Sequence, residues 1–286
     1  MFISKASNLA CPIDGERLVL HEKQLACKNG HSFDVSRQGY VNLLPVQHKR
    51  SKEPGDSKEM VIARTEFLNS GFYEPVADKL TEMLLARLLD NHSGRQETCL
   101  LDAGCGEGYY LDFIINSPDF NNKLSLIGLD ISKPAIISAA KRNNQISWIV
   151  GTNRQPPVLE NSVDIILCVF GFQNYAGFRK ILKTDGKIIL VEPGTDHLKE
   201  LREIIYNDPK ITEIPGSCLA EENGLQVADE QSLLYKITLN NNKQIKNLLL
   251  MTPHFYRANK TGREAALELQ EIALTVEMVF RVLEKK

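Results

Sequence analysis

The stretch that decides the fold is Leu100-Leu101-Asp102-Ala103-Gly104-Cys105-Gly106-Glu107-Gly108-Tyr109-Tyr110. It is typical of a buried strand that ends in an acid and runs into a glycine-rich turn. A dinucleotide site needs the spacing G-x-G-x-x-G against a pyrophosphate, whereas these glycines alternate at 104, 106 and 108. An acid before alternating glycines suits S-adenosylmethionine instead, because this cofactor has no phosphate and carries a cationic amino group and a sulfonium.

Short apolar strands and helices alternate after this turn. Strands are predicted at Cys99–Asp102, Leu124–Asp130, Ser147–Gly151, Asp164–Phe170 and Gly186–Glu192, with helices at Pro134–Arg142 and Tyr175–Leu182. The pattern predicts an α/β fold with a parallel, doubly wound, Rossmann-like sheet. Asp130 ends the second strand, where a carboxylate can accept hydrogen bonds from both ribose hydroxyls. The alternative is a glycine turn in a sheet that binds nothing.

The flanking segments are predicted to be mainly helical. Helices are expected from about Lys58 to Asn69 and from Pro75 to Leu89, then at Leu198–Tyr206, Asn247–Met251 and Glu264–Ile272. The final antiparallel strands are expected at Gln231–Leu239 and Leu274–Leu283. Residues 252–255 are expected to form a loop with His254 at the surface.

Near the start of the chain, cysteine and histidine have the spacing of a zinc ribbon. The candidate ligands Cys11, Asp14, Cys27 and His31 are separated by two, twelve and three residues. Asp14 stands where cysteine is expected, and an oxygen ligand is less common in structural zinc sites. His21 is a further candidate. The alternative is that Cys11, Cys27 and His31 pack in a small core without metal.

A polar segment at Gln47–Glu59 follows, around a Pro54-Gly55 turn. Its basic side chains can contact nucleic-acid phosphates, although a solvated linker is the alternative. The candidate contacts are His48, Lys49, Arg50 and Lys52. The chain therefore divides into a zinc-ribbon-like domain at 1–45, a basic linker at 46–58, and a cofactor-binding domain at 59–286 whose residues 59–90 form a helical cover.

Composition sets the remaining limits. The 286 residues include 34 Lys and Arg against 36 Asp and Glu, so the net charge of −2 indicates no nucleic-acid partner by itself. Residues 1–60 hold nine basic and seven acidic side chains, so this part is +2 and the remainder is −4. Without a long apolar stretch or a secretory signal, no membrane association is expected. Six cysteines are too sparse for a disulfide scaffold, and Cys99, Cys105 and Cys168 lie in or beside apolar runs as packed free thiols do, so a reducing cytoplasm is expected.

Several longer segments carry a family resemblance. CPID with CKNGH, GYVNLLPVQHKR, PGDSKEM, ARTEFL, GFYEP, LDAGCGEGYY and GLDISKPAI together resemble the bacterial 23S rRNA (guanine-N1)-methyltransferases, from about Cys11 to at least His254. The resemblance implies a zinc ribbon that helps to bind an rRNA hairpin, a Rossmann-like methyltransferase domain and a homodimer. It also implies that S-adenosylmethionine contacts Gly106, Glu107, Tyr73 and His197.

Three of the candidate cofactor residues have alternative roles. An aromatic face at Tyr73 can lie near the sulfonium, or Tyr73 can be a packing residue. His197 follows the carboxyl end of a strand, where such sheets bind ligands, or it faces solvent in a first helical turn. Asn153 can read the adenine edge or stabilise a loop turn.

The acceptor side departs from the family pattern. After the fourth strand the family usually has a small residue and a proline behind an aromatic, whereas this chain has Phe170-Gly171-Phe172-Gln173. In the family that loop normally borders the acceptor base, so the resemblance assigns Phe170 and Phe172 to the base pocket, where Phe172 stacks on a flipped guanine or fills the cleft. No residue stands out as the base that removes the guanine N1 proton. The alternatives are a methyltransferase with another acceptor, an RNA base or a small molecule, and a non-catalytic RNA-binding protein that keeps cofactor affinity.

Overall fold

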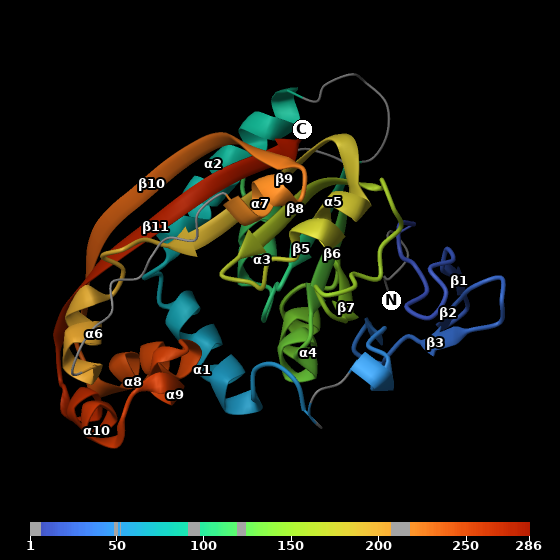
Figure 1. The fold of residues 1–286 in the computed structure, drawn as a ribbon. Helices are drawn as coiled ribbons and strands as arrows, with labels where there is room; N and C mark the ends of the chain where they lie inside the picture. Colours follow the sequence, from blue (N-terminus) through green and yellow to red (C-terminus); the bar gives the residue numbers. More distant parts are fainter. Residues whose placement is uncertain (1–6, 49–50, 52, 91–97, 119–123, 207–217) are drawn as a thin grey trace.

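The computed structural model describes residues 7–48, 51, 53–90, 98–118, 124–206 and 218–286, and an eight-stranded sheet lies at its centre (Figure 1). The strands are β4 (Tyr40–Asn42), β5 (Thr98–Ala103), β6 (Leu124–Asp130), β7 (Ser147–Val150), β8 (Val163–Val169), β9 (Leu182–Pro193), β10 (Leu225–Leu239) and β11 (Ile272–Lys285). Their order is β10-β11-β9-β8-β5-β6-β7-β4. All neighbours from β4 to β9 pair in parallel, and β11 is antiparallel to both β9 and β10. The predicted α/β, Rossmann-like fold is confirmed.

Helices cover both faces of this sheet. They are α1 (Lys58–Asn69), α2 (Glu74–Asp90), α3 (Tyr109–Ile115), α4 (Lys133–Arg142), α5 (Tyr175–Ile181), α6 (Lys199–Ile205), α7 (Cys218–Glu222), α8 (Asn242–Met251), α9 (His254–Arg257) and α10 (Lys260–Glu268), with the 3-10 helix η1 at Val46–His48. Buried side chains of α1 to α4 share one core with the sheet, whereas α5 and α7 pack in the core on its other face. Serine caps fix two of the helix starts beside the site: Ser57 Oγ accepts from Met60 N in α1, and Ser132 Oγ accepts from Ala135 N in α4.

Two predictions for the C-terminal part are wrong. The helix expected at Glu264–Ile272 spans Lys260–Glu268, because Asn259 caps its start and Ile272 already pairs with Leu239 in the sheet. Residues 252–255 do not form a plain loop, because α9 begins at His254. His254 is half-buried rather than at the surface, and its Nδ1 lies 3.0 Å from the hydroxyl of Tyr206.

The N-terminal segment packs against the large sheet. Its strands β1 (Val19–His21), β2 (Gln24–Ala26) and β3 (Ser32–Asp34) form a separate antiparallel sheet, drawn in blue beside β7 in Figure 1. Leu18 and Leu25 are buried in the same core as Leu101 of the central strand β5. The next strand, β4, extends the large sheet by pairing with β7. A region too small to bury a core of its own is thus supported by its neighbour.

Two expectations from composition concern the cysteines and the membrane, and the described part of the chain can be compared with both. None of the six cysteines forms a disulfide, and Cys99, Cys105 and Cys168 are buried as the packed thiols expected from the sequence. No helix there is long and apolar enough to cross a membrane.

Candidate cofactor-binding and metal sites

The glycine-rich turn joins β5 to α3 at the carboxyl end of the parallel strands. Gly104, Gly106 and Gly108 have φ values of 100°, 56° and 84°, in the left-handed region that favours glycine. A Cβ on Gly104 would lie 3.3 Å from Cα of Gly171, in the loop after β8. A Cβ on Gly108 would lie only 2.6 Å from a ring carbon of Trp148. The turn therefore needs glycine both for its backbone conformation and for its close packing.

A cavity of about 610 Å³ opens at this edge of the sheet. This volume is in the range of small-molecule and cofactor sites. Most of the predicted cofactor and acceptor residues line the cavity: Tyr73, Asp102, Gly104, Gly106, Glu107, Asp130, Asn153, Phe170, Phe172 and His197. Gly108 lies behind the turn against Trp148 and does not line it. The fold therefore gathers residues from position 73 to position 197 around one space.

Asp130 lies at the end of β6 and is held by two backbone amides. Its Oδ2 accepts from Gly106 N at 3.0 Å, and its Oδ1 accepts from Ser132 N at 2.7 Å. Burial is the main cause of a raised pKa at this carboxyl. Because each carboxylate oxygen can accept more than one hydrogen bond, the fixed carboxylate can still accept from the hydroxyls of a ribose.

Buried oxygens on the cavity wall provide a test of whether the site fits a cofactor. Asp102 Oδ1, Glu107 Oε1 and the Tyr110 hydroxyl are buried without a hydrogen-bond partner in the described part of the chain. Burial, and secondarily the charge of Asp130, raises the pKa of Asp102 to about 8. Such groups cost about 1–3 kcal/mol each when unsatisfied. A ligand that brings an ammonium group and hydroxyls would satisfy them, so the wall fits S-adenosylmethionine.

Glu107 has a second role in the structure. Its Oε2 accepts from Nε of Arg142 at 2.8 Å, and only 1% of the residue is exposed. The pKa of Glu107 is raised by burial, which the charge of Arg142 partly offsets. The side chain thus ties the glycine turn to α4 as well as lining the cavity.

Tyr73 and His197 lie in contact on the cavity wall, although they are far apart in the sequence. The Tyr73 hydroxyl lies 3.3 Å from Nε2 of His197, and Nδ1 of His197 accepts from the backbone N–H of Glu277 at 3.4 Å. Burial lowers the pKa of His197 to about 3, so the ring is neutral at neutral pH. Because Nδ1 accepts, the ring proton lies on Nε2 and is donated to Tyr73, whose own hydroxyl proton stays available for a ligand.

Two exposed aromatic rings in the loop after β8 border the cavity. Phe170 is 45% exposed and Phe172 is 58% exposed. Phe170 has a φ of 55°, a costly conformation for a bulky residue that is found mostly at functional sites. Asn153 donates from Nδ2 to the Phe172 carbonyl oxygen at 3.1 Å, and the guanidinium of Arg154 lies 5.2 Å from the Phe172 ring centroid. Asn153 therefore supports this loop in addition to lining the cavity.

Sequence reasoning missed several other side chains on the cavity wall, among them Arg64 and His254. Arg64 forms an ion pair with Asp56 and donates from Nη2 to the carbonyl oxygen of Met251 at 3.1 Å. A signal for Arg64 was present, because it falls at helical spacing between Met60 and Leu68 on the apolar side of α1. His254 had no such signal, since α9 has only four residues.

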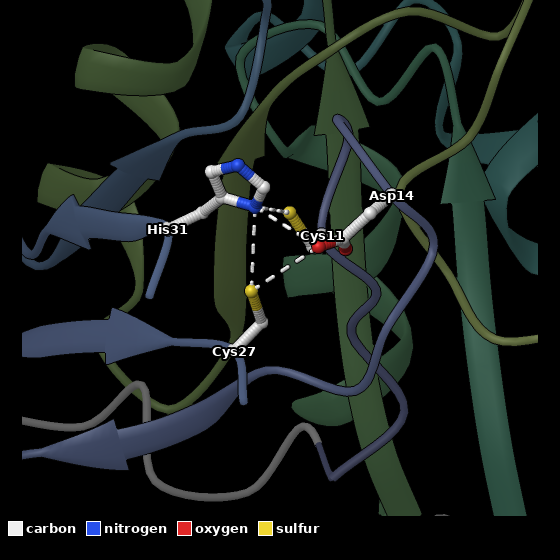
Figure 2. A group of neighbouring side chains, drawn as sticks. All are labelled: Cys11, Asp14, Cys27 and His31. Carbon is white, nitrogen blue, oxygen red and sulfur yellow. Dashed lines mark hydrogen bonds and ion pairs between the residues drawn. The ribbon is translucent and has the colours of Figure 1, made fainter. Parts of the chain in front are cut away.

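The four predicted metal ligands converge in the N-terminal segment (Figure 2). Nδ1 of His31 lies 3.5 Å from Sγ of Cys11, 3.4 Å from Sγ of Cys27 and 3.0 Å from Oδ2 of Asp14. All four ligand atoms lie within 4.8 Å of one another. Ligands about 2.0–2.3 Å from a tetrahedral zinc ion lie about 3.3–3.8 Å apart, so this set fits zinc. Hydrogen bonds, first from Asn29, hold the pKa of Asp14 well below its usual range, so the carboxylate is ionised.

The basic linker can be described only in part. Lys49, Arg50 and Lys52 lie outside the described residues, and for His48 the structure gives only the backbone, at the end of η1. The contact of these residues with RNA stays a prediction.

The sheet order, the glycine turn, Asp130 and the cavity define an S-adenosylmethionine-dependent methyltransferase. A family model described as a methyltransferase domain matches residues 100–203. A second model, a zinc ribbon described as "RlmA, N-terminal", matches residues 9–52, which include the four converging ligands.

The chain belongs to the 23S rRNA (guanine-N1)-methyltransferase family. It is 32% identical over 280 residues to a Bacillus subtilis protein provisionally named 23S rRNA (guanine-N1)-methyltransferase YxjB, covering 95% of each chain. It is 36% identical over 194 residues to the 23S rRNA (guanine(748)-N1)-methyltransferase of Streptomyces fradiae, covering 68% of this chain and 66% of the relative. A Micromonospora griseorubida protein with a similar provisional name is 31% identical, with 91% and 92% of the two chains covered.

Proposed function

We propose that this protein transfers the methyl group of S-adenosylmethionine to N1 of a guanine in a hairpin loop of 23S rRNA. The observation that carries the proposal is the cavity that joins the glycine turn to the exposed rings of Phe170 and Phe172. One end has the acids and bare backbone that a cofactor needs, and the other has flat apolar surfaces on which a base can stack. The family relatives are named for this reaction.

In this proposal, each residue at the cofactor end of the cavity binds a different part of S-adenosylmethionine. Asp130 holds the ribose hydroxyls, Asp102 receives the amino group, and Asn153 borders the adenine. The bare backbone at Gly104 and Gly106 allows close approach, and Gly108 lets the turn pack on Trp148. Glu107, Tyr73 and His197 complete the wall around the methionine part. The cofactor supplies a methyl group already activated by a sulfonium, so the protein mainly positions the reactants.

The acceptor end selects a flat, extruded base. Phe172 presents an exposed ring, and Arg154 adds a guanidinium beside it. A base in a hairpin loop is only partly stacked, so flipping it into the cavity costs little. A small-molecule acceptor would have no use for the basic residues His48, Lys49, Arg50 and Lys52.

The N-terminal segment recognises the RNA in this proposal. Zinc held by Cys11, Asp14, Cys27 and His31 would fix the two turns that carry the ligands, and the basic linker would contact phosphates. We also place the enzyme in the cytoplasm as a homodimer, since rRNA is its substrate and the resemblance implies a dimer.

Methyl transfer to RNA tests the proposal. Unmodified 23S rRNA is incubated with the protein and labelled S-adenosylmethionine, then digested to nucleosides that are separated and identified by mass. We expect the label in 1-methylguanosine. Label in another nucleoside, or none while the cofactor binds normally, would reject the assigned acceptor.

A further inference from the structure

Arg64 brings a positive charge to the glycine turn from a different part of the fold. It lies on α1, and its guanidinium lines the cavity. A Cβ on Gly106 would lie 3.5 Å from Nη1 of Arg64, so the guanidinium rests close to the bare backbone of the turn.

The guanidinium is fixed in place from two sides. Asp56 forms an ion pair with Nη1, and the carbonyl oxygen of Met251 accepts from Nη2 at 3.1 Å. Asp56 is itself anchored, because its carbonyl oxygen accepts from Ser132 Oγ at 2.7 Å in the loop after β6. A guanidinium has five N–H groups, so these two contacts leave donors for a ligand.

The charges of the cofactor create a need for such a group. The methionine part of S-adenosylmethionine has a cationic ammonium, a cationic sulfonium and one carboxylate. Asp102 and Asp130 attract the ammonium and the ribose hydroxyls, but they repel a carboxylate. The carboxylate therefore needs a cation close to the glycine turn, where the methionine part of the cofactor approaches the protein backbone.

Four arginines line the cavity, and their positions differ. Arg154 lies over the ring of Phe172 on the acceptor side. Arg202 donates to the carbonyl oxygen of Thr195, and Arg257 is exposed on α9. Among these four, Arg64 is the one placed against Gly106.

We propose that Arg64 binds the carboxylate of the methionine part of the cofactor. A guanidinium matches a carboxylate in shape as well as charge and can donate two parallel hydrogen bonds to it. The ion pair with Asp56 makes Asp56 a positioning residue that keeps the guanidinium at the turn. This inference rests on the S-adenosylmethionine site of the proposed function but not on the identity of the acceptor.

A pair of ligands tests the inference without RNA. S-adenosylhomocysteine carries the carboxylate, and S-adenosyl-3-thiopropylamine is the same molecule without it. Calorimetric titration of both into the wild type and Arg64→Gln should show a loss of about 10- to 100-fold for S-adenosylhomocysteine only, as expected for a charge-assisted hydrogen bond. The binding of the decarboxylated ligand should change less than about twofold, as the logic of a double-mutant cycle requires.

Two matched variants complete the design. Arg87→Gln removes an arginine of α2 whose partner is Asp229, outside the cavity, and should bind both ligands like the wild type. Arg64→Gln is also made in an Asp56→Asn background, since the lone Asp56 carboxylate would otherwise repel the ligand. The selective loss should persist there.

An equal loss for both ligands would overturn the inference, because Arg64 would then act only by holding α1 and the turn together. No loss for either ligand would overturn it too. Failure of the wild type to bind S-adenosylhomocysteine would reject the cofactor site as a whole. Absence of methyl transfer to RNA with these binding results intact would reject only the proposed acceptor.

Discussion

Asp102 shows the conflict between stability and binding at a single residue. Its carboxyl is 1% exposed, Oδ1 has no partner in the described part of the chain, and burial raises its pKa to about 8. The unfolded chain releases this proton near the ordinary value of 3.8. The folded state thus binds more protons than the unfolded state between about pH 4 and pH 8, and its stability falls as the pH rises through that window.

Replacing this carboxyl should therefore stabilise the free protein. Asp102→Asn is expected to raise the free energy of unfolding at pH 8 by about 2 kcal/mol more than at pH 5, because the neutral amide leaves no charge to bury as the pH rises. The same variant should bind S-adenosylhomocysteine more weakly, because the amino group loses its charged partner. Urea unfolding at pH 5 and pH 8 checks the first point and calorimetry the second. Asp185→Asn, at an exposed position of β9, is the control; equal pH slopes for the wild type and Asp102→Asn would contradict the account.

Asp14 is the residue at which the metal site departs from the usual set of zinc ligands, because cysteine is expected at this position. Cysteine at this position would restore three soft ligands, so Asp14→Cys should raise zinc affinity by about tenfold, and Asp14→Ala should lower the bound zinc. Metal analysis and competition with a chelator measure both effects. Full zinc content in Asp14→Ala would mean that Asp14 is not a ligand, and His21→Ala in that background would then test the remaining candidate.

At the scale of elements, the turn between β5 and α3 is the most constrained connection. In Gly108→Ala the new Cβ would lie 2.6 Å from Trp148 at a φ of 84°. We expect a loss of about 2–4 kcal/mol in the free energy of unfolding, from strain and overpacking together. Gly39→Ala is the matched control, since Gly39 has a φ of 91° with nothing within 4 Å of the added carbon. Its loss should be about 1 kcal/mol from backbone strain alone; equal losses in thermal or urea unfolding would contradict the packing role of Gly108.

The elements differ in how well the sequence predicts them. The buried strands β5, β6 and β8 were predictable, because each is a run of apolar residues that ends in a turn or a functional residue. The helix α10 was misplaced by four residues because Asn259, rather than the apolar pattern, sets its start. The short helix α9 has too few residues for any periodic signal.

The site was predictable where chemistry and chain position coincide. Asp102 and Asp130 are acids at strand ends, and parallel strands bring such ends to one edge. The contact between Tyr73 and His197 and the bond from Arg64 to Met251 join segments more than 120 residues apart. Such pairs arise from packing of the helical cover, which local sequence patterns do not encode.

At the scale of the whole molecule, charge is divided unevenly between the first 60 residues and the rest of the chain. The first 60 residues are +2 and the remainder is −4. If Lys49, Arg50 and Lys52 contact phosphates, replacing all three by glutamine should reduce the slope of log affinity for the RNA hairpin against log salt by about 2. Cofactor affinity should stay unchanged, because none of these three side chains has a role in the proposed cofactor site. Binding titrations at four salt concentrations measure the slope; an unchanged slope would make this segment a plain linker.

The central claim is methyl transfer to guanine N1 of 23S rRNA, and mapping of the modified position tests it most directly. A methyl group at N1 blocks Watson–Crick pairing, so reverse transcription stops at a modified guanine. Unmodified 23S rRNA treated with the protein and S-adenosylmethionine should show one new stop, at a guanine in a hairpin loop, which is missing with Asp130→Ala. No new stop, or a methyl group mapped to another base by mass, would contradict the account.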